Sequence, residues 1–176
     1  MKIFLILPLS FVFFSLNGQE RSNPVIEEYG GIYEIPNATV DVDTESQYKI
    51  VVDVFSSSES PKEVNPALYN VARMLNLHGI SGVPPENLTI VLAIHGGATY
   101  AIMDNISYSA KYGIDNPNTG LLDALDNAGV RLTVCGQSLV GRKVDHQSIH
   151  PDIEIATSML TTVTTHQLQG YTLLRF

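Results

Sequence analysis

Apolar runs rich in β-branched residues alternate along the chain with stretches whose apolar residues recur at helical spacing. Residues 48–55 (YKIVVDVF) and 88–94 (LTIVLAI) are typical of strands buried on both faces, and residues 130–134 form a shorter run of the same kind. Residues 152–156 alternate as in a short strand, and residues 171–176 indicate a last strand at the terminus. The pattern predicts five strands.

Helix signals lie between these runs. The Asn-Pro pair at residues 65–66 offers an N-cap acceptor and a proline for the first helical position, and helical spacing continues to Gly79. The same pair recurs at residues 116–117, where we expect a further helix that runs to Gly129. Two more helices are predicted over residues 101–113 and 159–170.

Strands separated by helices predict an α/β fold. Parallel neighbours need a crossover helix, and that helix must bury its apolar stripe, so we expect a mostly parallel five-stranded sheet covered on both faces. The chain has 176 residues, of which 44% are hydrophobic, and this is enough for one core. We therefore expect a single domain over residues 48–176.

The N-terminal segment has the layout of a secretory signal peptide. Lys2 precedes an apolar stretch that ends near Leu16, and small and polar residues follow, so we expect a signal peptide at residues 1–18. A membrane-spanning helix needs roughly 20 apolar residues. We expect an exported protein, periplasmic or secreted, without a membrane anchor after cleavage. Residues 19–47 are polar and turn-rich and are interpreted as an arm laid across the body or a neighbouring subunit.

Charge and cysteine content narrow the possible partners. The formal net charge is −8 and the chain has no Lys/Arg run, so nucleic acid is not an expected partner. Cys135 is the one cysteine, and no disulfide can form within the chain. Its thiol is therefore free, paired with another molecule, or buried and inert.

Cys135 follows the third predicted strand, at the sheet edge where ligands and catalytic groups of parallel sheets collect. A thiol at a strand-to-helix turn lies near the positive end of the helix dipole, which favours the thiolate. Gly136 allows close backbone approach, and Gln137 and Ser138 add hydrogen-bond donors. The alternative is a small buried hydrophobic residue.

His95 follows the second predicted strand and is the candidate general base for this thiol. The alternative is a histidine that bonds the backbone at a strand end. Gly96 and Gly97 come next and are candidate ligand-binding residues, although the GxGxxG spacing of dinucleotide sites is absent. Asp53 ends the first strand and is a weaker candidate for orienting His95.

No motif indicates a metal or cofactor. The sequence lacks CxxC and HExxH, and no histidine has a metal-ligand spacing with Cys135. We therefore expect no metal and no cofactor. The remaining histidines are expected at the surface: His78, His146, His150 and His166.

Four short segments, at residues 91–96 (VLAIHG), 129–130 (GV), 134–139 (VCGQSL) and 168–171 (LQGY), resemble the DsrE/DsrF-like family. The resemblance covers residues 48–176. It implies a three-layer fold with a parallel five-stranded sheet, and assembly into homo-oligomers or hetero-oligomers.

The resemblance also implies a function for Cys135. Members active in sulfur relay carry sulfane sulfur as a persulfide on a cysteine after a central strand, and Cys135 is the matching position. This predicts a thiol-based sulfur carrier with a donor and an acceptor protein as partners. The alternative is a non-catalytic oligomeric module that binds a small ligand or mediates assembly. A thiol oxidoreductase is a weaker third reading, because a resolving cysteine is absent.

Overall fold

The computed structural model describes residues 19–176, so the predicted signal peptide at residues 1–18 lies outside the described residues. Within the described part, no helix is long and apolar enough to cross a membrane. In chain order the elements are β1 (Tyr48–Val54), α1 (Pro66–Ile80), η1 (Pro85–Asn87), β2 (Leu88–Ile94), η2 (Gly96–Tyr100), α2 (Asn105–Tyr112), α3 (Thr119–Asn127), β3 (Arg131–Cys135), α4 (Gly136–Arg142), β4 (Glu154–Ala156), α5 (Met159–Leu168) and β5 (Thr172–Arg175).

The five strands form one sheet in the order β4-β3-β2-β1-β5. Every neighbouring pair is parallel, which confirms the predicted parallel sheet. Its centre is β1 and β2, the two long apolar runs, which pair along their full length from Tyr48↔Leu88 to Val54↔Ile94. Because parallel strands end at the same edge, β1, β2 and β3 present their last residues side by side.

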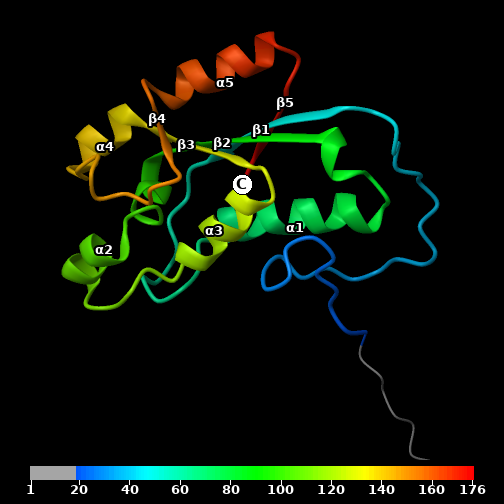
Figure 1. Ribbon diagram of the computed structural model, residues 1–176, viewed down its shortest axis with the longest axis horizontal. Coiled ribbons are helices and arrows are strands. Elements are labelled where there is room, and N and C mark those ends of the chain that lie inside the picture. The colour runs from blue at the N-terminus through cyan, green and yellow to red at the C-terminus, as the bar shows by residue number, and fades with distance from the viewer. Residues whose placement is uncertain (1–18) are drawn as a thin grey trace, which may run out of the picture.

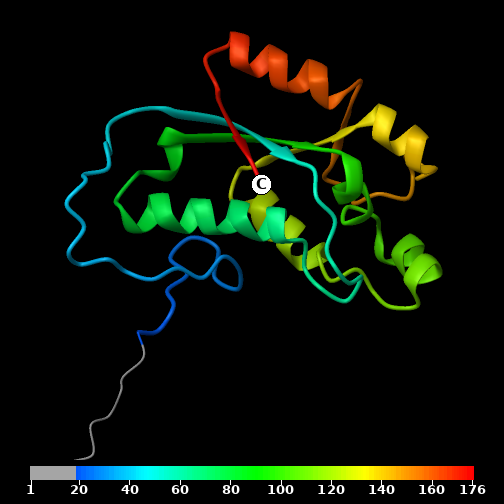
Figure 2. The same ribbon diagram turned by 180° about the vertical axis from the view of Figure 1, so that it is seen from behind.

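Helices cover both faces of the sheet, in three layers (Figures 1 and 2). Helices α1 and α3 pack on one face over the large core, to which Leu68, Leu92 and Leu122 belong. Helix α5 covers the opposite face, where a small second core joins Val51 and Ala93 to Val163. The three-layer α/β/α arrangement implied by the family resemblance is confirmed.

Helix α1 begins as its sequence predicts. The Asn65 side chain accepts hydrogen bonds from the amides of Ala67 and Leu68, and Pro66 occupies the first helical position. The side-chain amide of Asn65 donates to the Ser56 carbonyl over 2.8 Å, and this hydrogen bond connects the helix start to the loop after β1. The helix start is therefore fixed at the carboxyl edge of the sheet.

The prediction for the second Asn-Pro pair is wrong. Helix α3 begins only at Thr119, because the Asn116 side chain is engaged elsewhere: it donates to the Ala101 and Met103 carbonyls and accepts from the Asn118 amide. Asn118 in turn accepts a hydrogen bond from the Asn65 amide over 2.6 Å. The pair acts as a buried link between loops, not as a helix cap.

The helix predicted over residues 101–113 is shorter than expected. Ala101 and Ile102 are buried in the turn that follows η2, and α2 begins after Asp104, whose carboxylate caps the Ser107 amide. The apolar spacing of Ala101 and Ile102 results from burial in a turn, and periodicity alone does not distinguish such a turn from a helix.

The first part of the N-terminal arm, residues 22–32, lies beside α1 (Figure 1), and the buried Asn76 side chain makes most of the arm's hydrogen bonds to that helix. Asn76 Oδ1 accepts from the amides of Val25 and Ile26, at 2.9 and 2.8 Å, and its amide group donates to the carbonyls of Tyr29 and Gly30. Gly30 has φ of +70°, and a Cβ there would lie 2.2 Å from the Arg73 amide nitrogen. Residues 22–32 of the arm are thus packed against the body of the same chain, whereas residues 33–43 are exposed.

Candidate functional site

Asp53, His95 and Cys135 lie at the carboxyl ends of three neighbouring strands, on the same face of the sheet. Side chains alternate along a strand, and Val51 and Ala93 face α5, so Asp53 and His95, two residues further on, face the same way. Cys135 pairs with Ala156 of β4, and its sulfur reaches the start of α5. The sheet therefore gathers the predicted chemical residues at one edge.

The Cys135 thiol lies between the starts of two helices. It is the residue before α4, and its Sγ lies 4.0 Å from the hydroxyl of Ser158, the N-cap of α5. The residue is only 4% exposed. Burial raises the pKa of the thiol, but hydrogen bonds from the Met159 amide, from Ser138 and from Ser158 outweigh it, so the pKa lies below its ordinary value.

Ser138 contributes to this shift through its side chain and its backbone, so its hydroxyl can be tested separately. We expect Ser138→Ala to raise the thiol pKa and to slow alkylation of Cys135 at neutral pH about fivefold, the equivalent of one hydrogen bond of about 1 kcal/mol. The measurement is the alkylation rate against pH with a small reagent. Gln137→Ala, in the same turn but exposed, is the matched control and should leave the profile unchanged. Identical profiles for the two variants would contradict this role of Ser138.

His95 is engaged by Asp53. Its Nε2 lies 2.5 Å from Asp53 Oδ1, and because a carboxylate only accepts, this nitrogen carries the proton. Arg175 lies 3.4 Å from the other Asp53 oxygen, and the Phe55 ring packs against the imidazole at 5.2 Å between centroids. Asp53 therefore orients His95, as the sequence suggested. Within residues 19–176, no hydrogen bond joins His95 to Cys135.

The glycines after His95 have packing roles. Gly96 has φ of +56°, and a Cβ there would lie 2.4 Å from the Phe55 ring, while one on Gly97 would lie 2.8 Å from the Ser57 amide nitrogen. The Gly96 amide donates to Ser138 Oγ over 3.3 Å and joins the turns after β2 and β3. These contacts fix the edge of the sheet around the site.

Gly136 and Gln137, the other predicted ligand-binding residues, lie in the turn after Cys135. Gly136 is the first residue of α4, and a Cβ there would lie 3.0 Å from the Ala156 carbonyl, so glycine allows β4 to approach. Gln137 is exposed. Whether either residue binds a ligand stays a prediction.

A cavity of about 330 Å³ lies at the same edge, on the side of α2. Gly97, Tyr100, Tyr108 and Arg142 are among its lining residues, and Cys135 is not one of the described residues that line it. The Arg142 guanidinium lies 5.7 Å from the centre of the Tyr100 ring. Aromatic faces beside a cation suit a small planar or anionic ligand.

Sequence reasoning missed two features. The first is the contact of Ser158 and Met159 with Cys135, which exists only because β3 and β4 are neighbours. The sequence signal for it is a serine that follows the fourth strand by two residues and directly precedes a helix. His150 was expected at the surface and this is wrong, because it is buried and its amide donates to the Ile102 carbonyl over 2.8 Å.

Fold and site together define a parallel three-layer α/β protein with a thiol at the carboxyl edge of its sheet. The chain belongs to the DsrE/DsrF-like family, whose family model matches residues 49–176. This family is linked to sulfur relay.

Solved structures with a similar fold include two whose relation to this chain can be given in numbers. The protein of unknown function MTH1491 from Methanobacterium thermoautotrophicum is 16% identical with a TM-score of 0.56, and the ychN protein from E. coli is 21% identical with a TM-score of 0.54. Each match covers 73% of this chain and 99% of the other. No curated protein matches the chain in sequence. At these identities the likeness concerns the fold alone.

Proposed function

We propose that this protein is a thiol-based sulfur carrier in which Cys135 holds sulfane sulfur as a persulfide. The observation that carries the proposal is the environment of the thiol, where hydrogen bonds from two helix starts lower its pKa although the side chain is buried. A thiolate is the nucleophile that sulfur transfer requires. Membership of a family linked to sulfur relay supports the same reading.

The proposed cycle has two exchange steps. The Cys135 thiolate attacks the outer sulfur of a donor persulfide, so that a new S–S bond forms at Cys135 while the donor S–S bond breaks and the donor leaves as a thiolate. An acceptor thiolate then attacks the outer sulfur on Cys135, takes it as a persulfide and restores the Cys135 thiolate. Because one thiolate replaces another in each step, no external oxidant or reductant is needed.

The residues around Cys135 would stabilise both anionic forms of the sulfur, the thiolate and the persulfide anion. As a thiol, Cys135 donates to the Ser158 hydroxyl over 4.0 Å; once the sulfur is deprotonated, the Met159 amide and the Ser138 and Ser158 hydroxyls can donate toward it, as a thiolate or a terminal persulfide requires. His95 is proposed as a proton acceptor for an incoming thiol, because its bond to Asp53 leaves Nδ1 with a free lone pair.

Discharge of the bound sulfur tests this proposal. The protein is loaded with a small alkyl persulfide, desalted and mixed with excess small thiol, and persulfide-selective labelling follows both partners. We expect the label to leave Cys135, and the persulfide on the small thiol together with the sulfide that excess thiol releases from it to account for the lost sulfur in matching amounts. A persulfide that persists on Cys135 in the presence of excess thiol would show a dead-end modification and would overturn the carrier role.

We also propose export of the chain and assembly into a homo-oligomer, with a sulfur donor and a sulfur acceptor protein as further partners. Large apolar side chains around α4, β4 and α5 are exposed, and a second copy would cover them. They include Val140, Ile155, Leu160 and Leu168. The layout of residues 1–18 supports export.

The alternative function is a non-catalytic module that binds a small ligand. The 330 Å³ cavity beside Tyr100 and Arg142 favours it, as does the burial of Cys135. This alternative predicts that Cys135 resists alkylation in the folded protein at every pH at which the fold persists.

A further inference from the structure

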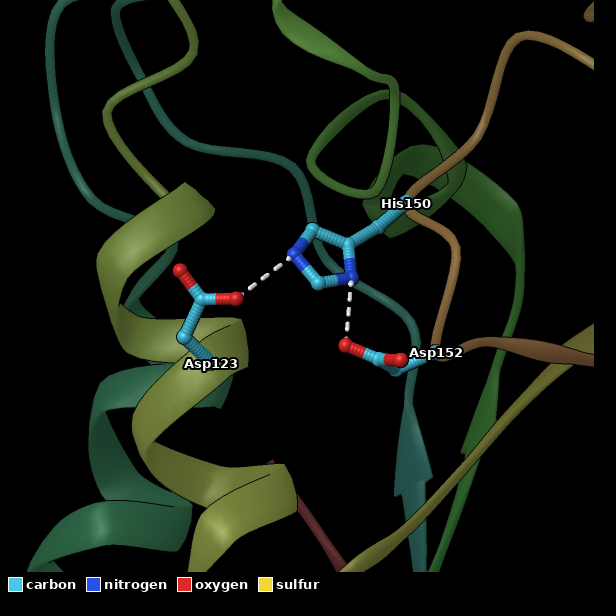
Figure 3. A group of neighbouring side chains, drawn as sticks. All are labelled: Asp123, His150 and Asp152. Carbon is cyan, nitrogen blue, oxygen red and sulfur yellow. Dashed lines mark hydrogen bonds and ion pairs between the residues drawn. The ribbon is translucent and has the colours of Figure 1, made fainter.

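A histidine and two aspartates lie together outside the Cys135 site (Figure 3). The His150 side chain, 6% exposed, lies between Asp123 of α3 and Asp152 of the loop before β4. Its Nε2 is 3.1 Å from Asp123 Oδ1, and its Nδ1 is 3.7 Å from Asp152 Oδ2. One ligand atom from each residue lies within 4.8 Å of the others.

The Nδ1 atom of His150 is buried and, within the described part of the chain, has no hydrogen-bond partner. If Nε2 donates its proton to Asp123, Nδ1 keeps a lone pair, and this lone pair points toward Asp152 (Figure 3). A buried polar atom without a partner is costly. A distance of 3.7 Å to Asp152 is too long for a hydrogen bond.

The same distance suits two ligands of one metal ion. Ligand atoms at about 2.1 Å from a tetrahedral zinc ion lie about 3.4 Å apart, close to the separation of Nδ1 and the Asp152 carboxylate. Imidazole nitrogen with carboxylate oxygen is a donor set of zinc and similar ions. Asp123 completes the arrangement, since a metal-binding histidine commonly donates its other N–H to a carboxylate.

We infer that His150 Nδ1 and the Asp152 carboxylate bind a divalent transition-metal ion, with Asp123 positioning the imidazole. The Asp123 and Asp152 side chains are 52% and 48% exposed, so the carboxylate side of the cluster faces solvent. The ion would bridge His150 and Asp152 within the loop before β4, and the hydrogen bond between His150 and Asp123 joins this loop to α3. The expectation of no metal rested on motif spacing, which this set of residues does not follow. The inference is independent of the proposed sulfur chemistry.

Zinc titration of the purified protein tests the site, and calorimetry is the readout. A Cys135→Ser background removes the thiol as a competing ligand. We expect one Zn²⁺ per chain, loss of binding in Asp152→Asn, and about 10- to 100-fold weaker binding in Asp123→Asn. Asp126→Asn removes an exposed carboxylate from the same helix and is the matched control that should bind as before. No zinc uptake, or equal uptake in Asp152→Asn, would overturn the inference.

Nitrogen NMR of the His150 ring gives a second readout that needs no aspartate variant. Zinc at this site should shift the Nδ1 resonance far more than that of Nε2. If the ring is instead an imidazolium held between two carboxylates, both nitrogens carry protons and zinc leaves both resonances unchanged. That outcome would replace the metal site with an ion-pair bridge.

Discussion

Replacing Cys135 with serine is expected to abolish uptake of sulfane sulfur. The chain has no other thiol, and at neutral pH a serine hydroxyl is neither the nucleophile nor the carrier that a persulfide requires. The measurement is persulfide-selective labelling after exposure to a small alkyl persulfide, with circular dichroism as the check that the variant is folded. Labelling that persists in folded Cys135→Ser would show that Cys135 is not the residue that takes up sulfur.

A relocated thiol is the matched control for this experiment. Adding Thr165→Cys to the Cys135→Ser chain restores one thiol at an exposed position in the second half of α5, away from the helix start and from the hydrogen bonds that surround Cys135. We expect this thiol to acquire sulfur at least about tenfold more slowly at neutral pH, because less of it is thiolate. Equal rates would mean that the native environment adds nothing beyond a thiol.

Replacing Asn76 with alanine is expected to lower the free energy of unfolding by about 3 kcal/mol. The change leaves the amides of Val25 and Ile26 and the carbonyls that Asn76 binds without partners, or it releases the arm and exposes Ile26 and Ile32. Urea denaturation measures the loss. Limited proteolysis should also show faster cleavage within residues 19–47.

Asn70→Ala is the matched control for this prediction. Asn70 is half-buried on the same helix and lies outside the hydrogen-bond network of the arm. We expect Asn70→Ala to change the free energy of unfolding by less than about 1 kcal/mol. Similar losses in the two variants would show that Asn76 does not anchor the arm.

Most of the fold could be predicted from the sequence because its strongest signals are long. The runs that became β1 and β2 are mostly apolar, and the last five residues of each strand are buried, as expected for strands covered on both faces. The cap at Asn65 was predicted correctly because its partners are the next residues of the chain. The identical pair at residues 116–117 failed because Asn116 bonds carbonyls of a preceding segment, and only the folded chain brings these together.

The candidate site shows the same division. Strand ends place Cys135 and His95 at one edge, and this follows from the order of elements along the chain. The hydrogen bonds that lower the pKa of the thiol come in part from Met159, which lies far along the chain and is near only because β4 pairs with β3. The burial of His150 likewise depends on packing against Ile102 and α3, so no local pattern marks it.

Intact mass of the purified protein before and after treatment with a sulfane donor tests the central claim most directly. We expect a gain of one or more sulfur atoms that maps to the peptide containing Cys135, and full reversal by a reducing thiol. An unchanged mass in folded protein, with Cys135 still open to alkylation after denaturation, would contradict it.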